Sequence, residues 1–260
     1  MIITLLTDFG TQDYFVGAMK GVILSINPRA TVVDITHEIP AHDIRAGAFT
    51  LRAAAETYPA GTVHVAVVDP GVGSERRAII AECAGQFFVA PDNGLLSYAC
   101  TRPTRVVNAT NRKFFRESVS DTFHGRDIFA PAAAALSSGV APAEFGEEVD
   151  DWVRLPAPAP RRSDDGTLEA SVIHVDRFGN LVTDITRGDL ADEEIARGAT
   201  LTLNGRTISR FRHFFAEDSD DAPFAIWGSA GFLEIAAFQA SAAEHLGARV
   251  GQSIQVNFVK

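Results

Sequence analysis

The first 68 residues alternate between two kinds of apolar segment, and this alternation restricts the fold more than any other feature of the sequence. Residues 2–7, 31–36 and 63–68 are short runs rich in β-branched residues, as buried strands are. Residues 13–26 carry apolar side chains at helical spacing, and residues 43–58 are rich in alanine. This order of strands and helices predicts a largely parallel sheet flanked by helices, with right-handed crossovers.

Further elements of the same region follow the third strand. Residues 78–82 and 86–90 form an expected strand pair, and residues 106–108 form another expected strand. A short helix is expected over residues 95–100, and an alanine-rich helix over residues 128–136. Together these elements extend the α/β pattern well beyond the first three strands.

Residues 157–166 separate two regions that differ in residue composition and in hydrophobic pattern. This segment is rich in proline and then in charged residues, lacks periodicity, and predicts a semi-rigid linker. Short β-rich runs follow it, separated by turn residues such as Asn204-Gly205. The expected strands are 169–175, 181–185, 200–203, 224–227, 232–236 and 253–259. We therefore expect an α/β domain over residues 1–156 and a smaller, all-β, barrel-like domain over residues 167–260.

Charge and hydropathy narrow the class of protein. The formal net charge is −10 and the pI is near 5.1, which disfavours a nucleic-acid partner. No apolar run approaches the roughly 20 residues that a membrane-spanning helix needs. The apolar N-terminal run lacks a basic region and reaches Asp8 at once, unlike a secretory signal. We expect a cytoplasmic protein with no membrane partner, in which Cys83 and Cys100 are buried free thiols.

Polar residues follow each of the first three predicted strands. Asp8 follows the first strand, His37 and Glu38 follow the second, and Asp69 follows the third. Because the carboxyl ends of parallel strands meet at one edge of a sheet, this edge is the expected ligand site. Asp69 opens the sequence Asp-Pro-Gly-Val-Gly, whose glycines permit a ligand to approach the backbone closely. A plain turn, with Asp69 only as its first residue, is the alternative.

The residue types alone leave the chemistry open. Clustered Asp and His residues suit a divalent metal, so a metal-dependent hydrolase is one candidate. The α/β region contains no H-x-x-x-H or H-x-D spacing, however, and we expect no metal site. The Gly71-Val72-Gly73 sequence does not complete a dinucleotide-binding motif, because position 76 is Arg. No Ser lies in a G-x-S-x-G motif, so a side-chain nucleophile is not expected.

Six short motifs occur in one order along nearly the whole chain. They are Thr7-Asp8-Phe9-Gly10-Thr11 with Asp13, Val68-Asp69-Pro70-Gly71-Val72-Gly73 with Arg76, Asp92-Asn93-Gly94-Leu95-Leu96, Thr122-Phe123-His124-Gly125-Arg126-Asp127, Phe178-Gly179-Asn180, and Gly228-Ser229 with Gly231. In this register the chain resembles the S-adenosyl-L-methionine hydroxide adenosyltransferase family, whose relatives include fluorinase and chlorinase enzymes. Each motif is weak alone, whereas six in register are specific.

The resemblance implies a reaction and an assembly. Water or hydroxide displaces methionine from the ribose C5′ of S-adenosyl-L-methionine, which gives adenosine and L-methionine without a cofactor. Asp69, Arg76 and His124 match the family's residues that handle the attacking water. The resemblance also implies an N-terminal α/β domain, a C-terminal β-barrel domain, and a homotrimer whose active sites lie between subunits.

The resemblance further assigns substrate-binding residues. Asp8 matches the carboxylate that binds the ribose 2′- and 3′-hydroxyls, a task for two acceptors. Asn180 matches the residue that reads the adenine edge, with Phe123 and Phe178 beside the nucleoside. The residues that match those holding the methionine amino and carboxylate ends are Asp13, Asp176 and Ser229. Structural roles are the alternatives: a helix cap for Asp13, a turn for Asn180, and core packing for the two phenylalanines.

Two rival functions are open. Halide transfer, as in a chlorinase, uses the same substrate, but Asp69, Arg76 and His124 together favour hydroxide as the nucleophile. A non-catalytic nucleoside or S-adenosylmethionine binding protein would keep the ribose and adenine contacts but would not need Arg76 and His124 together. Ala230 stands where the fluorinase carries an arginine near the methionine carboxylate, so the resemblance does not identify the group that neutralises this carboxylate.

Overall fold

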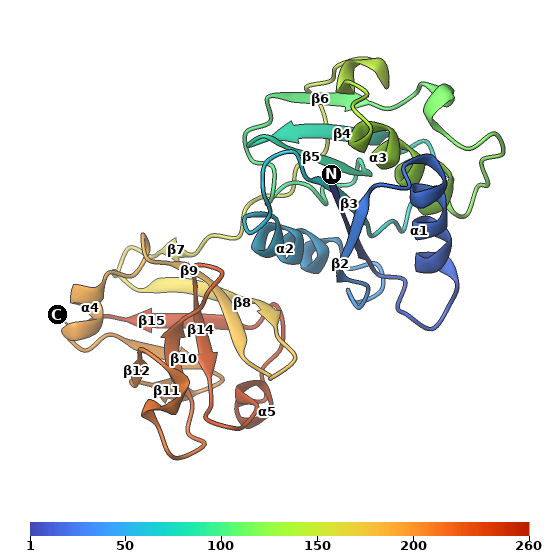
Figure 1. Ribbon diagram of the computed structural model, residues 1–260. Coiled ribbons are helices and arrows are strands. Elements are labelled where there is room, and N and C mark those ends of the chain that lie inside the picture. Colours follow the sequence, from blue (N-terminus) through green and yellow to red (C-terminus); the bar gives the residue numbers. More distant parts are fainter. Residues whose placement is uncertain (260) are drawn as a thin grey trace. The chain divides into compact units, whose positions relative to one another are not determined.

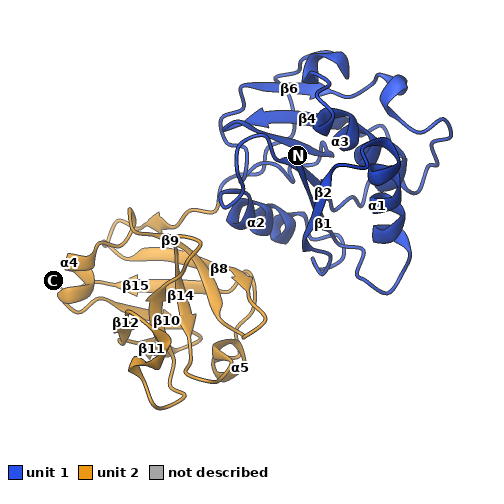
Figure 2. Ribbon diagram, in the orientation of Figure 1, with its two compact units in different colours: residues 1–157 blue, residues 158–260 orange. Residues whose placement is uncertain are grey.

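The computed structural model describes residues 1–259, which form two compact units (Figure 2). The first unit comprises residues 1–157, and the second begins at Pro158. Within the segment expected to be a linker, Arg161–Arg162 form a short strand, β7, which pairs with β8 (Leu168–Val175) of the second unit. No described helix has both the length and the apolar character that crossing a membrane requires.

A six-stranded mixed sheet forms the centre of the first unit (Figure 1). Its strands, in spatial order, are β2 (Thr31–Thr36), β1 (Ile2–Thr7), β3 (Val63–Val67), β5 (Gln86–Pro91), β4 (Ala78–Cys83) and β6 (Arg105–Asn108). The first four run parallel, whereas β4 is antiparallel to both β5 and β6. The predicted parallel sheet is therefore confirmed only in part. The Ala84-Gly85 turn, in which both φ angles are positive, reverses the chain between β4 and β5.

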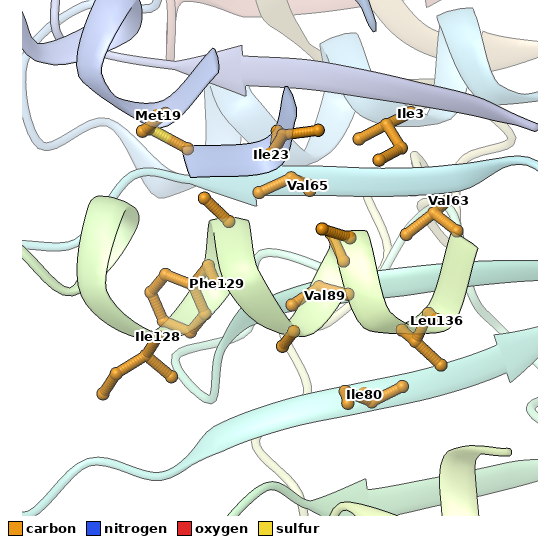
Figure 3. Packing of buried hydrophobic residues seen from close by; sticks show 14 of the residues in the cluster. Ile3, Met19, Ile23, Val63, Val65, Ile80, Val89, Ile128, Phe129 and Leu136 are labelled. Atoms are coloured by element: carbon orange, nitrogen blue, oxygen red, sulfur yellow. The ribbon is translucent and has the colours of Figure 1, made fainter. Parts of the chain in front are cut away.

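Helices cover both faces of this sheet. They are α1 (Phe15–Ile26), α2 (Ile44–Ala55) and α3 (Ala130–Ser137), with 3-10 turns at Arg112–Phe114 and Pro142–Glu144. Met19 of α1 and Leu136 of α3 share one buried cluster with Val65 of β3 (Figure 3). Leu51 of α2 lies in a second cluster with Ala66, the next residue of the same strand. Because successive strand residues point to opposite faces, the two clusters lie on the two sides of the sheet.

Residues 95–100, which are expected to be helical, form turns instead, so this prediction is wrong. Side chains here compete for the backbone groups that a helix would use. Asn93 Oδ1 accepts a hydrogen bond from Leu95 N at 3.2 Å, and Ser97 Oγ donates to Gly94 O at 2.7 Å. Such local bonds favour a turn over a helix.

Cys83 and Cys100 form a disulfide, so the expectation of free thiols is wrong. Cys83 ends β4, and Cys100 follows the turns over residues 95–99. The two Cα atoms are 5.6 Å apart, a separation typical of disulfides. The cysteines are 17 residues apart in the sequence, and that spacing alone does not predict that the turn approaches the end of β4.

His64 lies in the middle of β3 and has no exposed surface. Its Nδ1 lies 2.8 Å from Thr4 Oγ1 of β1, and its ring stacks on Phe88 of β5 with 4.9 Å between the centroids. Burial lowers the pKa of His64 to about 4. The imidazole of the folded protein is therefore neutral at neutral pH.

We predict that His64 makes the protein less stable in mild acid. The unfolded chain protonates this ring below about pH 6.5, whereas the folded protein does so only near pH 4. Because the unfolded state binds more protons between these values, the free energy of unfolding falls as the pH is lowered. Urea titrations should show a loss of about 2 kcal/mol between about pH 7.5 and pH 5. The variant Thr4→Val/His64→Leu removes both partners and should lose most of this difference; an unchanged difference would contradict the assignment.

The second unit is built on a curled sheet. Its strands, in order, are β11 (Arg206–Ile208), β10 (Thr200–Leu203), β15 (Ser253–Asn257), β8, β9 (Leu181–Thr186), β14 (Phe232–Ala236), β13 (Phe224–Trp227) and β12 (Phe211–Arg212), with β7 beside β8. Neighbouring strands are antiparallel except for β12 and β13. Short helices α4 (Asp192–Ala196) and α5 (Ala242–Leu246) and a 3-10 turn (Phe215–Glu217) accompany the strands.

Strand β8 has a different neighbour along each half of its length. This strand pairs with β15 through Leu168–Ser171 and with β9 through Val172–Val175, with a bulge between the two parts of the second pairing. The end strands β11 and β12 do not pair with each other within residues 1–259. The expected β-rich unit is thus confirmed only in part, because short helices accompany its strands and its sheet is open rather than a closed barrel. The predicted Asn204-Gly205 turn joins β10 and β11, with both φ angles positive.

Candidate active site

An ion pair between Asp69 and Arg76 lies just beyond the end of β3. A turn over residues 70–74 reverses the chain and brings Arg76 back to Asp69. Arg76 Nε lies 3.0 Å from both carboxylate oxygens, and Nη2 lies 2.5 Å from Oδ2. The two side chains are only 10% and 4% exposed. This fork-like pairing holds the Asp69 carboxylate in one orientation.

His124 completes a line of three polar side chains. Its Nδ1 lies 2.7 Å from Arg76 Nη2. Because a guanidinium only donates hydrogen bonds, Nδ1 accepts, and the proton of the neutral ring resides on Nε2. Burial lowers the pKa of His124, and the positive charge of Arg76 lowers it further. The ring is therefore neutral and offers an N–H donor at Nε2.

An irregular helical turn follows His124 directly. Gly125–Phe129 form a π-helical turn, in which Ala130 N donates to Gly125 O, before α3 begins. Such turns contain one more residue than an α-helical turn and are frequent at functional sites. The helix expected over residues 128–136 is therefore confirmed in position, but it is preceded by a wider turn.

Asp127, inside the π turn, fixes the loop that carries His124. Its fully buried carboxylate accepts hydrogen bonds from Arg126 Nε at 2.7 Å, Ser120 N at 2.9 Å and Arg116 Nη1 at 3.3 Å. Burial alone would raise the pKa of Asp127, but the hydrogen bonds from Arg126 and Ser120 outweigh it and lower the pKa to about 2. This carboxylate is therefore an ionised anchor and does not carry protons at neutral pH.

Gly73 brings the turn after β3 against the loop that precedes His124. Its φ is +79°, and a Cβ placed on it would overlap the backbone oxygen of Asp121. Only glycine allows the two loops to touch in this way. Asn93 holds the segment just before this turn, because its Nδ2 donates to Val68 O at 2.8 Å.

A cavity of about 110 Å³ lies beside Asp69 and His124. Its remaining walls are mostly apolar and are formed by Phe9, Phe15, Val67, Val72, Thr122, Phe123 and Gly125. Polar groups in such surroundings interact more strongly than they do in water. The cavity has room for a small reacting group and a water molecule beside the carboxylate and the imidazole.

Phe123 belongs to both the core and the wall of this cavity. Its ring centroid lies 5.1 Å from that of Phe15 and 6.0 Å from that of Phe9. The Arg126 guanidinium lies 5.1 Å from the same ring. Phe123 therefore packs in the core, which is one of its two expected roles. Its ring also lies next to His124.

Asp8 lies at the same edge of the sheet as Asp69. The register pairs Thr7 with Val67, so that the ends of β1 and β3 are neighbours. The Asp8 carboxylate is largely buried, and its Oδ2 accepts a hydrogen bond from His42 N at 2.9 Å. The backbone contact orients this carboxylate and leaves it further acceptor capacity.

Two other polar residues of this edge have different surroundings. Asp13 is exposed, and Tyr14 is the N-cap of α1, so the helix-cap alternative for Asp13 is wrong. His37 is buried, with Nδ1 2.9 Å from Thr7 Oγ1 and Nε2 3.2 Å from Asp34 Oδ1. Across residues 1–259, no three His, Cys, Asp or Glu side chains are grouped so that they could hold a metal ion.

The second unit has its own cavity, of about 940 Å³. Four of the predicted substrate-binding residues line it: Asp176, Phe178, Asn180 and Ser229. Aromatic side chains supply much of the remaining wall, namely His213, Phe214, Phe215, Trp227 and Phe238. Phe178 is 76% exposed, so the core-packing alternative is wrong for this residue. A large cavity with aromatic walls and a few polar groups is typical of a small-molecule site.

The turn from Asp176 to Asn180 is held by the Asp176 carboxylate. Oδ1 accepts hydrogen bonds from Phe178 N at 2.9 Å and from Asn180 N at 2.8 Å, and Oδ2 accepts from Asn180 Nδ2 at 2.9 Å. Gly179 packs against Ser241, the N-cap of α5, where a Cβ would overlap the hydroxyl. Asn180 therefore lies in a turn, and its side-chain amide is held by Asp176 in the cavity wall.

Glu234 of β14 also lines the cavity, although the sequence motifs do not include it. Its side chain is half-buried and packs over Gly228, where a Cβ would overlap the carboxylate. One signal in the sequence could have pointed to it: Glu234 is the only charged residue in the otherwise apolar run Phe232–Ala236, close to the Gly228-Ser229 motif. Strand periodicity alone does not reveal that this side chain faces a cavity.

Known proteins share both units of this chain. Residues 3–146 match the SAM hydroxide adenosyltransferase N-terminal domain, and residues 170–255 match the SAM hydroxide adenosyltransferase C-terminal domain. A protein of Salinispora arenicola named (R)-S-adenosyl-L-methionine hydrolase is 39% identical over 98% of this chain and 97% of its own. A protein of the same name from Thermus thermophilus is 37% identical over 96% of this chain and 97% of its own.

More distant sequences and a solved structure agree with this placement. Proteins named fluorinase match at 26% to 30% identity. The crystal structure of an uncharacterized conserved protein from Thermotoga maritima matches with a TM-score of 0.89 and 32% identity. That match covers 98% of this chain and 99% of the other.

Proposed function

Because this chain belongs to the S-adenosyl-L-methionine hydroxide adenosyltransferase family, we propose that it hydrolyses S-adenosyl-L-methionine to adenosine and L-methionine. The observation that carries the proposal is the line of Asp69, Arg76 and His124 beside an apolar cavity. The relatives named (R)-S-adenosyl-L-methionine hydrolase support the same substrate. Water is the second reactant, and the proposal includes no cofactor.

The proposed step is a single in-line displacement. A water oxygen attacks the ribose C5′, the C–O bond forms as the C5′–S bond breaks, and the bonding pair goes to sulfur. The cationic sulfonium becomes the neutral thioether of methionine, and the oxygen loses a proton. Holding the water in line with the C5′–S bond removes the entropic cost of bringing the reactants together. Apolar walls exclude bulk water, which would otherwise stabilise the separate charges.

Each member of the polar line has a distinct proposed role. Asp69 accepts a hydrogen bond from the water and then takes its proton. An oxygen that has just bonded to C5′ as an oxonium is strongly acidic, so a carboxylate is a sufficient base. His124 Nε2–H donates to the water oxygen, because Nδ1 already accepts from Arg76. Arg76 holds both partners in place.

Other residues bind the substrate in this proposal. The Asn180 amide pairs with the N6 amino group and a ring nitrogen of adenine, a pairing that a carboxamide makes well. Phe178 covers the nucleoside, Phe123 lies near the ribose, and Asp8 accepts hydrogen bonds from the two ribose hydroxyls. The methionine ends are assigned to Asp13, Asp176 and Ser229. A homotrimer with active sites at subunit interfaces and a cytoplasmic location stay predictions; sedimentation of the purified protein tests the trimer.

Incubation of the purified protein with S-adenosyl-L-methionine tests the reaction. Chromatography should show adenosine and L-methionine in equal amounts. In ¹⁸O-labelled water the label should appear at the 5′-oxygen of adenosine. Formation of 5′-chloro-5′-deoxyadenosine in preference to adenosine, in the presence of chloride, would contradict the proposal. The Asp69 carboxylate beside the cavity disfavours that outcome, because it repels a halide ion.

Replacing Gly73 by alanine should lower kcat by about tenfold or more. The added Cβ would push the turn away from the Asp121 backbone and so move Asp69 and Arg76 relative to His124. Steady-state kinetics measure the effect. Gly71→Ala is the matched control, because a Cβ there makes only ordinary contacts, the shortest being 3.4 Å to Ser74 Oγ. Equal activity losses in the two variants would show that the contact with Asp121 does not matter.

A further inference from the structure

Two carboxylates line the cavity of the second unit. Asp176 and Glu234 both contribute to its wall, and neither pairs with a Lys or Arg side chain within residues 1–259. The Asp176 oxygens already accept three hydrogen bonds from its own turn. The Glu234 carboxylate, by contrast, accepts no hydrogen bond from any described residue. A buried or half-buried carboxylate without a donor is costly unless something else supplies one.

The surroundings keep the Glu234 carboxylate in this position. Gly228 has no side chain, and any Cβ on it would overlap Glu234. Burial raises the pKa of Glu234, and the negative charge of Asp176 raises it further. A cation bound between these carboxylates would relieve both effects. The same wall contains Trp227, whose Nε1 is buried and has no acceptor among the described residues. A polar ligand could supply the partner that the Trp227 N–H lacks.

We propose that Glu234 binds the α-ammonium of the methionine half of the substrate and thereby determines specificity for an amino acid end. This assignment rests on the proposed function and adds a residue to its substrate site. An ammonium has three N–H donors, whereas a sulfonium has none, so the unpaired acceptors of Glu234 suit the ammonium. Asp176 adds negative charge nearby while its oxygens hold the turn and the Asn180 amide.

A comparison of three substrates with two variants tests this role. The probes are S-adenosyl-L-methionine, its decarboxylated analogue, which keeps the amine, and its deaminated analogue, in which hydrogen replaces the ammonium. Glu234→Gln should raise KM and Kd for the first two on the order of tenfold to a hundredfold. It should leave both constants for the deaminated analogue, and kcat for all three, within about threefold. Glu244→Gln, which removes an exposed carboxylate on α5, is the control.

The outcomes separate this inference from the proposed reaction. Equal losses for all three probes in Glu234→Gln would overturn the role of Glu234, because the variant would then affect the cavity as a whole. Glu234→Asp keeps the charge and should recover part of the affinity; if Glu234→Gln does not fold, weaker binding of only the amine-bearing probes by Glu234→Asp still supports the role. Calorimetric binding is measured alongside turnover. A wild-type protein that binds these probes without forming adenosine would count against the reaction and not against Glu234.

Discussion

Replacement of Asp69 by alanine is expected to lower kcat by about two to four orders of magnitude while changing the Kd for S-adenosyl-L-methionine by less than about threefold. Asp69 is the proposed acceptor of the proton from water, and its oxygens are fixed by Arg76 at 3.0 Å or less. The substrate contacts are assigned to other side chains, such as Asp8 and Asn180. Single-turnover rates over a range of protein concentrations separate the rate of the chemical step from the affinity.

A matched variant makes this result interpretable. Glu75→Gln removes an exposed carboxylate from the same turn and should leave both constants unchanged. If the affinity of Asp69→Ala falls as much as its rate, then Asp69 binds the substrate and does not act on the water. If the rate falls by less than about tenfold, another group takes the proton.

Replacement of Asp127 by alanine should lower the free energy of unfolding by about 3 kcal/mol. This carboxylate is fully buried, and its loss leaves the donors of Arg126 and Ser120 without an acceptor. The loop before His124 would loosen as well, so activity should fall together with stability. Urea titrations at neutral pH measure the first effect, and the assay for adenosine measures the second.

The free energy of unfolding at acid pH tests the role of Asp127 a second time. Its pKa in the folded protein is about 2, compared with 3.8 for an ordinary Asp. Its contribution to stability is therefore fully present above about pH 5 and is lost as the pH falls toward about 2, because the unfolded state then binds more protons. Asp127→Ala should lack this component. Glu117→Ala, at an exposed position of the same loop, should behave like the wild type at every pH; a loss equal to that of Asp127→Ala would argue against a specific anchor.

Local patterns in the sequence predict much of the first unit. The strands Ile2–Thr7 and Thr31–Thr36 have the predicted bounds, because a run of β-branched residues ends at polar residues in each case. The features that were predicted wrongly depend on contacts between distant residues. The Cys83–Cys100 bond needs the turn after β5 to approach the end of β4, and the reversal of β4 depends on how a hairpin joins the sheet.

In the candidate site, too, local motifs are predictable from the sequence, whereas contacts between distant residues are not. Motif order alone identifies Asp69, Arg76 and His124, and the structure brings these three together. The sequence does not predict that His124 Nδ1 faces Arg76, and this contact decides which ring nitrogen carries the proton. The sequence does not single out Glu234, because its place in the cavity depends on a neighbouring glycine and on which face of β14 meets the cavity.

The π turn at Gly125–Phe129 has a consequence for how such a site arises and changes. Each residue of an α-helix turns the chain by about 100°, so one extra residue in the turn changes the direction of everything ahead of it. Deleting a single residue here would restore regular helical spacing and would rotate His124 away from Arg76 without altering either side chain. The alignment of the imidazole thus depends on the length of this segment as much as on its composition. Variation among relatives at this point is therefore expected to take the form of substitutions, whereas insertions and deletions should be confined to other loops.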